Sequence, residues 1–327
     1  MKIALTGTTG GLGRAICDAA LAQGFGVRGL ARDPRAAADL AARGVTLVRG
    51  DLETPSALLE LARGADVFIH SAAHVGDWGK REEFEHTNVG GTWRAIQAAA
   101  EGRVKRFVHV SSVAVYGRPR HGIIEETFPT TLVGTPYEDT KIAAEGLVFG
   151  RARELGLEVT AIRPPVILGP HDRVFLPRLI RQLDKGAAVL INGGEGLFNL
   201  VDVNDVIDVL FRCATLPAAV GQAFNVAADP PRVRDLFDAI ADGAGVRRAR
   251  LSIPRLPAML LARALDGGYR LAGSKHPPPV TPFVVTMMSL KVVYNARKAR
   301  DVLGWKGAEA PLPRIRELAA LEAKRPK

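Results

Sequence analysis

Short apolar runs alternate along the first half of the chain with longer segments rich in alanine, leucine and glutamate. Continuous apolar runs are typical of strands that are covered on both faces, and the segments between them are typical of helices. The alternation predicts a parallel sheet with helices on both sides, the doubly wound α/β class. The expected strands are 2–6, 26–31, 45–49, 66–70, 106–111, 158–163 and 223–227.

This rhythm changes after about residue 163. The segments 167–200 and 230–290 contain many prolines and glycines and no clean strand-helix repeat. A chain of 327 residues also exceeds the length at which one hydrophobic core usually stops growing. We therefore expect a main α/β domain with a smaller lobe that binds substrate. The boundaries are 1–166 for the main domain, with its sheet completed by about 203–228, and 167–202 and 229–327 for the lobe.

The turn after the first predicted strand is rich in glycine. Residues 6–13 read Thr-Gly-Thr-Thr-Gly-Gly-Leu-Gly, and a helix is predicted over 14–23. Glycines in this spacing allow a tight turn and a close approach of pyrophosphate to the free amides of a helix N-terminus. The pattern alone is weak, but its strand-turn-helix context predicts a Rossmann-type dinucleotide-binding domain over 1–166. The expected cofactor contacts are Gly7, Thr9, Gly10, Gly11, Leu12 and Gly13.

The end of the second predicted strand bears on the choice of cofactor. An NAD-binding fold usually carries an acidic residue there for the ribose 2′-hydroxyl, whereas this chain has Ala31 followed by Arg32. A guanidinium suits a phosphate dianion, so NADP(H) is the preferred cofactor, with NAD(H) as the alternative. The competing interpretation is that Arg32 only pairs with Asp33.

Two further strand ends are candidates for cofactor contact. Asp51 and Leu52 follow the third strand, where a carboxylate and an amide could hold the adenine edge, although a surface turn is the alternative. The small residues Ser71, Ala72 and Ala73 end the fourth strand and would let the backbone pass the cofactor; a simple tight strand exit is the alternative.

A phenol and an ammonium are predicted on one helical face. Tyr137 and Lys141 are four residues apart in a helix-like segment. To act near neutrality the pKa of the phenol must fall from about 10, and an ammonium about 4 Å away in a partly dry cleft supplies about 4 kcal/mol. Ser112 follows the fifth strand, at the sheet edge where open α/β folds bind ligands, and its hydroxyl can donate to a carbonyl oxygen. Capping of the strand exit is the alternative, which we favour for Ser111.

Composition narrows the classes of partner. Lys and Arg give the chain a formal charge of +10, but the basic residues are scattered and carry little aromatic interleaving, so no nucleic-acid site is expected. Cys17 and Cys213 stand in apolar segments without a CxxC or histidine cluster, which predicts buried thiols and no metal site. No long apolar run marks a leader or a transmembrane segment, and we expect a cytoplasmic protein.

With these residues assembled, the chain resembles the extended short-chain dehydrogenases/reductases of the NAD-dependent epimerase/dehydratase family. The resemblance rests on four motifs in order: residues 6–13, Ser111-Ser112-Val113-Ala114-Val115-Tyr116-Gly117, Tyr137-x-x-x-Lys141, and Arg163-Pro164-Pro165 followed by Leu168-Gly169-Pro170. It implies that Ser112, Tyr137 and Lys141 are the catalytic set and that Tyr137 and Lys141 also contact the cofactor. It further implies a cofactor role for Asn88, whose alternative is a helix-packing amide, and for Pro164 and Val166.

The chain departs from the sugar-nucleotide branch of that family. Those members usually have asparagine where this chain has Val166, and an arginine that grips the diphosphate where it has Phe198. The resemblance is to 3β-hydroxysteroid dehydrogenases and 2-alkyl-3-ketoalkanoate reductases. We expect an apolar cleft, although ordinary core, a homodimer face or a membrane surface are alternatives. The candidate cleft residues are Trp78, Phe175-Leu176-Pro177, 256–261 and 282–290.

The expected function is therefore an NADP-preferring oxidoreductase that interconverts a ketone and a secondary alcohol. Its expected partner is an apolar small molecule with a steroid-like, terpenoid or acyl skeleton. Two alternatives stay open at this point: a nucleotide-sugar epimerase or dehydratase with tightly bound NAD(P), and a non-catalytic protein that senses a dinucleotide.

Overall fold

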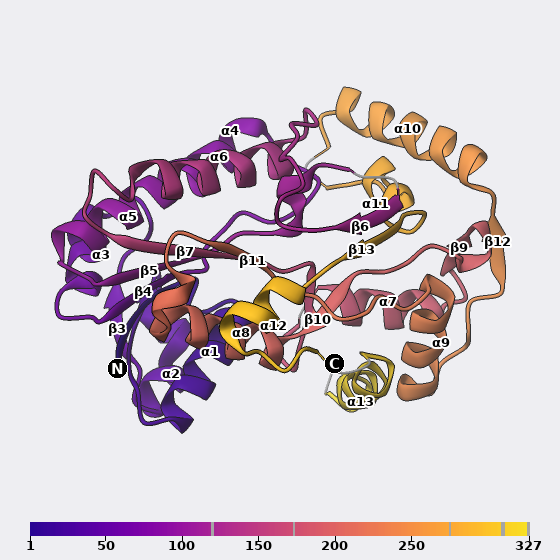
Figure 1. Ribbon diagram of the computed structural model, residues 1–327. Coiled ribbons are helices and arrows are strands. Elements are labelled where there is room, and N and C mark those ends of the chain that lie inside the picture. Colours follow the sequence, from indigo (N-terminus) through magenta and orange to yellow (C-terminus); the bar gives the residue numbers. More distant parts are fainter. Residues whose placement is uncertain (119–120, 173, 275, 309–310, 326–327) are drawn as a thin grey trace.

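A parallel sheet forms the centre of the main domain. The computed structural model describes residues 1–118, 121–172, 174–274, 276–308 and 311–325. Among them seven strands pair in the order β11-β7-β5-β4-β1-β2-β3, all parallel. Figure 1 shows this sheet between its helices. The strands are β1 (Lys2–Thr6), β2 (Gly26–Ala31), β3 (Thr46–Arg49), β4 (Val67–His70), β5 (Arg106–Val110), β7 (Glu158–Arg163) and β11 (Ala223–Asn225).

Helices cover both faces of the sheet, which is why its strands read as continuous apolar runs. Every residue of β4 and β5 is buried. One face packs against α3 (Pro55–Ala62), α5 (Gly91–Glu101) and α6 (Pro136–Arg151). The other packs against α1 (Gly11–Ala22), α8 (Val203–Thr215) and α12 (Arg297–Leu303). The doubly wound α/β class expected from the sequence is confirmed.

Short helices connect these elements. They are η1 (Pro34–Ala37), α2 (Ala38–Ala42), α4 (Arg81–Phe84), the π-helical η2 (Glu85–Gly90), η3 (Val113–Tyr116), η4 (Asn192–Gly194) and η5 (Pro217–Ala219).

A second hydrophobic core lies beside the sheet domain. It is built by α7 (Phe175–Asp184), α9 (Val233–Ala244), α10 (Arg255–Leu271), α11 (Pro282–Met287) and α13 (Pro311–Ala323). Two-stranded parallel pairs join distant segments in this part of the molecule. They are β8 (Val166–Leu168) with β10 (Leu200–Asp202), β9 (Val189–Ile191) with β12 (Leu251–Ile253), and β6 (His121–Ile124) with β13 (Lys291–Tyr294).

All seven predicted strands are present, with ends that differ by at most two residues. The first helix begins at Gly11, three residues earlier than the sequence suggested, because Gly10 takes an extended conformation as N-cap and the helix starts inside the glycine turn. Both cysteines are buried free thiols, as expected. Within the described ranges no helix is long and apolar enough to cross a bilayer.

Candidate active site

The glycine turn joins β1 to α1 at the carboxyl edge of the sheet. The Gly10 amide donates to the Gly7 carbonyl at 3.0 Å, which closes the turn. Thr9, Gly10 and Gly11 are exposed at the start of the helix, with the His171 backbone close to Gly11. Free amides at such a position form an anion site, and the helix dipole favours the negative charge.

Two glycines of this turn have no room for a side chain. Gly7 has a φ of +75°, and a Cβ there would lie 2.7 Å from the Ser71 hydroxyl. A Cβ on Gly13 would lie 2.0 Å from the Gly7 carbonyl oxygen. The backbone of α1 therefore packs directly on the turn, which is the arrangement that a dinucleotide pyrophosphate requires.

Arg32 and Asp51 lie at neighbouring strand ends, beyond β2 and β3. The side chain of Arg32 is exposed, and its charge contributes to lowering the pKa of Asp51, whose largest cause is a hydrogen bond from Thr54. Asp33 caps η1 and pairs with Arg35 at 3.6 Å instead of with Arg32. The interpretation that Arg32 is held by Asp33 is therefore wrong, and the Arg32 guanidinium is exposed to solvent at the end of β2.

The small residues after β4 lie against the glycine turn, as their position in the sequence suggested. The Ser71 hydroxyl donates to the Thr6 carbonyl at 2.7 Å, and the Ala72 amide donates to the Thr6 hydroxyl at 3.4 Å. These contacts hold residues 71–72 beside Gly7.

Ser112 follows β5 and turns its side chain toward η3. Its hydroxyl oxygen accepts from the Ala114 amide at 3.2 Å, and the hydroxyl donates to the Pro164 carbonyl at 3.4 Å. Ser112 is thus the cap of η3. Ser111, for which we favoured capping of the strand exit, is buried. Its amide donates to the Ile162 carbonyl at 2.8 Å, and its hydroxyl has no partner among the described residues.

Tyr137 lies in the first turn of α6, directly after Pro136. Burial raises the pKa of the phenol, and a hydrogen bond with the Ser112 hydroxyl works in the opposite direction. The neighbouring Glu138 carboxyl adds to the rise. The net direction is upward, so the phenol carries its proton at neutral pH.

Lys141 is buried one turn further along α6. Its ammonium donates to the Val110 carbonyl at 2.7 Å, and burial lowers its pKa to about 8. The Lys141 charge is not among the causes that shift the pKa of the Tyr137 phenol. The lowered tyrosine pKa expected from the sequence is therefore not found in this structure, because burial dominates and the ammonium turns toward β5.

Two buried imidazoles lie near Lys141. His70 and His109 stack with ring centroids 5.7 Å apart at the ends of β4 and β5. Burial and the Lys141 charge lower the pKa of both, to about 3 for His70. Both rings are therefore neutral, and they surround the lysine with a weakly polar environment.

Asn88 lies in the π-helical turn η2 and is buried. Its side-chain oxygen accepts from the His74 amide at 2.7 Å, and its nitrogen donates to the His74 carbonyl and the Thr140 hydroxyl, both at 3.0 Å. The amide thus ties the segment after β4 to α6. These contacts fit the alternative interpretation of Asn88 as a helix-packing amide.

A buried ion pair supports the strand end beside Pro164. The Arg163 guanidinium meets the Glu145 carboxylate of α6 through its Nε, at 3.0 and 3.2 Å, and its Nη2, at 2.5 Å. It also donates to the Tyr116 hydroxyl at 2.8 Å, which donates to the Asn225 side chain at 2.6 Å. The network connects β7, α6, η3 and β11 beneath the site.

The apolar segments expected to line a cleft are distributed differently. Leu176 is buried in the second core, and the Phe175 ring packs 5.1 Å from the Phe198 ring. Leu256, Leu260 and Leu261 are 71%, 59% and 52% exposed on α10, so the stretch 256–261 lines no buried cleft. The reason is that α10 packs through its small residues.

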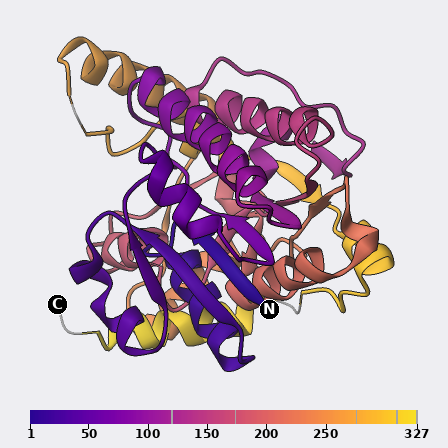
Figure 2. The same cartoon turned by 90° about the vertical axis from the view of Figure 1, so that its left-hand side faces the viewer.

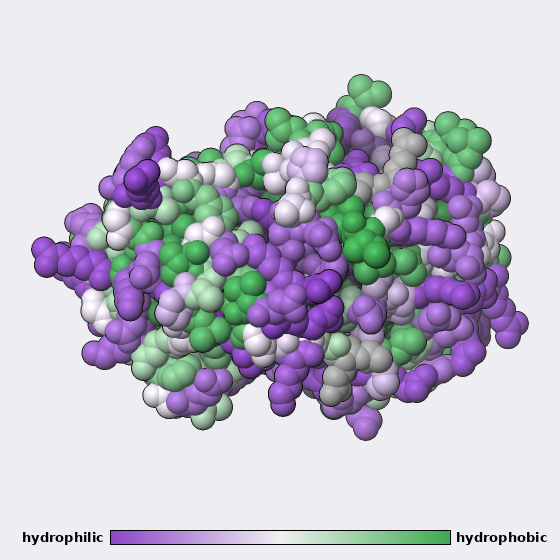
Figure 3. All heavy atoms as spheres, in the orientation of Figure 1, coloured by the Kyte–Doolittle hydropathy of each residue, from purple (hydrophilic) through white to green (hydrophobic). Residues whose placement is uncertain are grey.

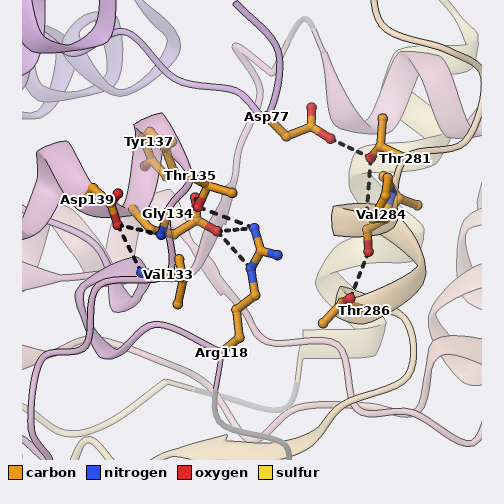
Figure 4. Close-up of polar contacts among 12 residues, drawn as sticks. Asp77, Arg118, Val133, Gly134, Thr135, Tyr137, Asp139, Thr281, Val284 and Thr286 are labelled. Atoms are coloured by element: carbon orange, nitrogen blue, oxygen red, sulfur yellow. Dashed lines mark hydrogen bonds and ion pairs between the residues drawn. The ribbon is translucent and has the colours of Figure 1, made fainter. Parts of the chain in front are cut away.

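Three contacts at the start of α6 and in the segment after β4 were not anticipated. Arg118 donates to Glu138 at 2.9 Å, one residue along α6 from the phenol. Asp77 accepts from the Thr281 hydroxyl at 2.5 Å, and Trp78 donates to the Ser274 carbonyl at 3.3 Å with Arg270 over its ring. Figure 4 shows Tyr137 with the start of α6 on one side and the Asp77–Thr281 pair on the other. Pairings 196 and 204 residues apart leave no local signal in a sequence.

Comparison with known proteins identifies the family. The model of the NAD dependent epimerase/dehydratase family matches residues 3–227. The chain belongs to this family. The match spans the glycine turn, Ser112, Tyr137 and Lys141, so the resemblance drawn from the four motifs is confirmed.

Two of the similar proteins are reductases. The 2-alkyl-3-oxoalkanoate reductase of Shewanella oneidensis is 27% identical over 92% of this chain and 81% of its own length. The 4-hydroxy-2-methyl-3-oxo-4-farnesyl-3,4-dihydroquinoline-1-oxide ketoreductase of Stigmatella aurantiaca is 30% identical over 94% of this chain and 92% of its own. Among solved structures, MoeE5 in complex with UDP-glucose and NAD superposes with a TM-score of 0.77 at 23% identity, covering 98% of both chains, which shows the fold.

Proposed function

We propose that this protein is an NADP(H)-preferring ketoreductase that interconverts an apolar ketone and its secondary alcohol. The observation that carries the proposal is the placement of Tyr137 in the first turn of α6, one helical turn before the buried Lys141, whose ammonium donates to the Val110 carbonyl of β5 just before Ser112. The chain belongs to an NAD-dependent family, and two of the proteins similar to it are reductases.

The residues present fit a dinucleotide. The cradle formed by Gly7, Gly10 and Gly13 would hold the pyrophosphate, Arg32 the 2′-phosphate, and Asp51 with Leu52 the adenine edge. Ser71, Ala72, Ala73 and Asn88 would lie along the cofactor, with Pro164 and Val166 beside the nicotinamide. The bound cofactor would supply the hydride that reduces the carbonyl carbon.

The chain's own part in the reaction is to place the carbonyl and to deliver a proton. Because burial raises the pKa of Tyr137, the phenol is protonated at neutral pH and can donate to the carbonyl oxygen as negative charge develops there. As a donor, the Ser112 hydroxyl makes a long 3.4 Å contact with the Pro164 carbonyl, so its hydrogen can turn toward the same oxygen. Lys141 would hold the nicotinamide ribose and place a positive charge near the phenol.

Packing at Phe198 supports an apolar substrate. This residue stands where sugar-nucleotide enzymes of the family tend to carry the arginine that grips the diphosphate. Here its ring is 2% exposed and packs on Phe175. The neighbouring Asn199 donates to the Val292 carbonyl at 2.9 Å. Phe198 is committed to the second core and Asn199 to β13, and neither offers a cation to a diphosphate.

A substrate panel tests the proposed function. We expect long-chain 2-alkyl-3-oxoalkanoates or polycyclic ketones to oxidise NADPH in stoichiometric amounts and to compete with one another for the holoenzyme. UDP-glucose and UDP-glucuronic acid are expected to bind at least about tenfold more weakly than these ketones. The reason is that Phe198 stands in place of the arginine whose charge-assisted contact would hold their diphosphate. Micromolar binding of a UDP-sugar, while every apolar ketone fails, would reverse the proposal.

Cofactor preference is tested at Arg32. NADP(H) is expected to bind more tightly than NAD(H), and Arg32→Ala should weaken NADP(H) by about tenfold or more while leaving NAD(H) nearly unchanged, because it removes a charge-assisted contact to the 2′-phosphate. Arg153→Ala is the matched control, since Arg153 is exposed in the connection that leads into β7, at the opposite edge of the sheet. Dissociation constants at fixed salt decide; equal binding of the two cofactors by the unaltered protein would contradict the assignment.

The Lys141 charge predicts a pH dependence of cofactor binding. Its pKa in the free protein is lowered to about 8, so the ammonium loses its proton as pH rises through that value. A bound anionic cofactor favours the charged form, so affinity should be constant below about pH 7 and fall up to tenfold per pH unit above 8. The Lys141→Met variant should bind the cofactor weakly, and its affinity should not decline above pH 8. Fluorescence titrations across this range measure it, and an unchanged pH profile in Lys141→Met would remove the role.

A further inference from the structure

The helix α10 has an unusual distribution of side chains. Its buried positions are alanines, Ala258 at 4% and Ala262 at 0% exposed, which pack in the second core with α11. On the opposite side Leu256 and Leu260 are 71% and 59% exposed, and Leu271 is 93% exposed. An ordinary surface helix buries its leucines and exposes its polar residues, so this one is inverted.

The exposed leucines lie along one stripe. Leu256 and Leu260 are four residues apart, and Leu271 falls on the same side eleven residues later, close to three further turns. Leu261 widens the stripe, and Leu251, 60% exposed in β12, precedes it. Figure 2 shows α10 standing out from the body of the molecule, and in Figure 3 apolar spheres project at the upper edge over this helix. We call this set of five leucines the leucine stripe.

Arginines surround the leucine stripe. Residues 246–271 contain six arginines and a single acidic residue, Asp266, which pairs with Arg270 at 2.9 Å. Arg248 pairs with Asp242. The ion pairs among the described residues involve none of the other four, which are exposed: Arg247, Arg250, Arg255 and Arg263.

An arginine-lined cavity adjoins the N-terminal end of α10. It has a volume of about 690 Å³, and its lining includes Arg234, Arg247, Arg248 and Arg250 together with Leu251. Asp238 is its one acidic lining residue. Arg248 already pairs with Asp242 and Arg234 donates to the Gly193 carbonyl, whereas Arg247 and Arg250 make no ion pair among the described residues. Guanidinium groups suit a phosphate group, because each can donate two parallel hydrogen bonds.

We propose that the leucine stripe and the arginine-lined cavity together form a docking surface for an anionic membrane. The leucines enter the boundary between headgroups and acyl chains, and the arginines bind lipid phosphates. Charge selects this occupant: a second copy of a chain with a charge of +10 would bring arginine against arginine, whereas an anionic lipid surface complements them.

The end of the docked helix contacts Trp78, in the segment that follows β4. Arg270, in the last turn of α10, lies 4.5 Å over the Trp78 ring, and Trp78 donates to the Ser274 carbonyl. If the proposed function holds, an apolar ketone reaches the enzyme from the lipid surface on which α10 rests. The docking itself does not depend on that function.

Vesicle flotation with the full chain tests the proposal. The protein is expected to float with vesicles of phosphatidylglycerol and phosphatidylcholine, and to stay behind with phosphatidylcholine alone. Exchanging the stripe residues Leu256, Leu260 and Leu271 for serine, or Arg247, Arg250 and Arg263 for glutamate, should each lower partitioning by at least about tenfold. All six side chains are exposed, so folding should survive, and thermal unfolding checks it.

Matched controls separate the surface from its surroundings. Leu321→Ser, at a leucine 50% exposed on α13, and Arg153→Glu should partition as the unaltered protein does. Light scattering in parallel reports any second copy on the stripe. The proposal would be overturned if the stripe variants floated as well as the unaltered protein. It would also be overturned if the protein failed to bind vesicles and formed a dimer that the leucine exchanges dissociate. Partitioning that is lost while NADPH turnover of a dissolved ketone is unchanged would support docking independently of the chemistry.

Discussion

Replacing Tyr137 by phenylalanine is expected to lower kcat for ketone reduction by about 10²- to 10⁴-fold, because the variant keeps the ring and loses the proton donor. The neighbouring Ser112 hydroxyl cannot replace the phenol as proton donor, because it is a far weaker acid. NADPH affinity should stay within about threefold, because the ring still packs in the first turn of α6. Steady-state rates over a range of pH, with cofactor titrations on the same preparations, measure both quantities.

Two variants accompany this measurement. Ser112→Ala should lower kcat by about 10²-fold, the usual effect of losing one donor to a developing oxyanion. Tyr269→Phe in α10 is the control and should leave kcat unchanged. A Tyr137→Phe enzyme that retains more than about a tenth of kcat would show that another group is the acid.

Removing Glu145 is expected to cost about 3–5 kcal/mol in the free energy of unfolding. The Glu145→Ala variant leaves the Arg163 guanidinium buried without its carboxylate, and both side chains are less than a tenth exposed. Urea unfolding measures the change. Glu154→Ala is the control: its pair with Arg151 is more than half exposed on both sides and is worth about 1 kcal/mol or less.

A double exchange distinguishes loss of a pair from loss of packing. Methionine at both Glu145 and Arg163 removes the two charges together, and such replacements are often near neutral. We expect the double variant to recover a large part of the stability lost in Glu145→Ala. A cost for Glu145→Ala no greater than that of the exposed control would contradict the importance of this pair.

Much of the main domain could be predicted because its signals are local. Strands covered on both faces must be apolar at consecutive positions, and the glycine turn leaves its spacing in the sequence. The start of α1 was misplaced because Gly11 and Gly13 have low helix propensity, which the packing of the turn against β1 overrides. Asp33 caps η1 and pairs with Arg35 of that helix, two residues along, although Arg32 is its immediate neighbour in the sequence.

The site and the second lobe show where local signals end. The i to i+4 spacing placed Tyr137 and Lys141 correctly on α6, but it could not reveal that the ammonium turns to the Val110 carbonyl. Which face of α10 is buried depends on the distant α11, so an apolar stretch at 256–261 gave no sign that its leucines point outward. The network of Arg163, Glu145 and Tyr116 joins elements that only the fold brings together.

The most direct test of the proposed chemistry is a single turnover with NADPH that carries deuterium at the transferable position. With an apolar ketone bound, we predict that the deuterium appears on the carbinol carbon of the product, with one NADPH consumed per alcohol formed, and that Tyr137→Phe slows this step by at least about 10²-fold. Turnover in which a nucleotide sugar changes configuration with enzyme-bound NADP⁺ or NAD⁺ that is regenerated in oxidised form, while no apolar ketone oxidises NADPH, would contradict it.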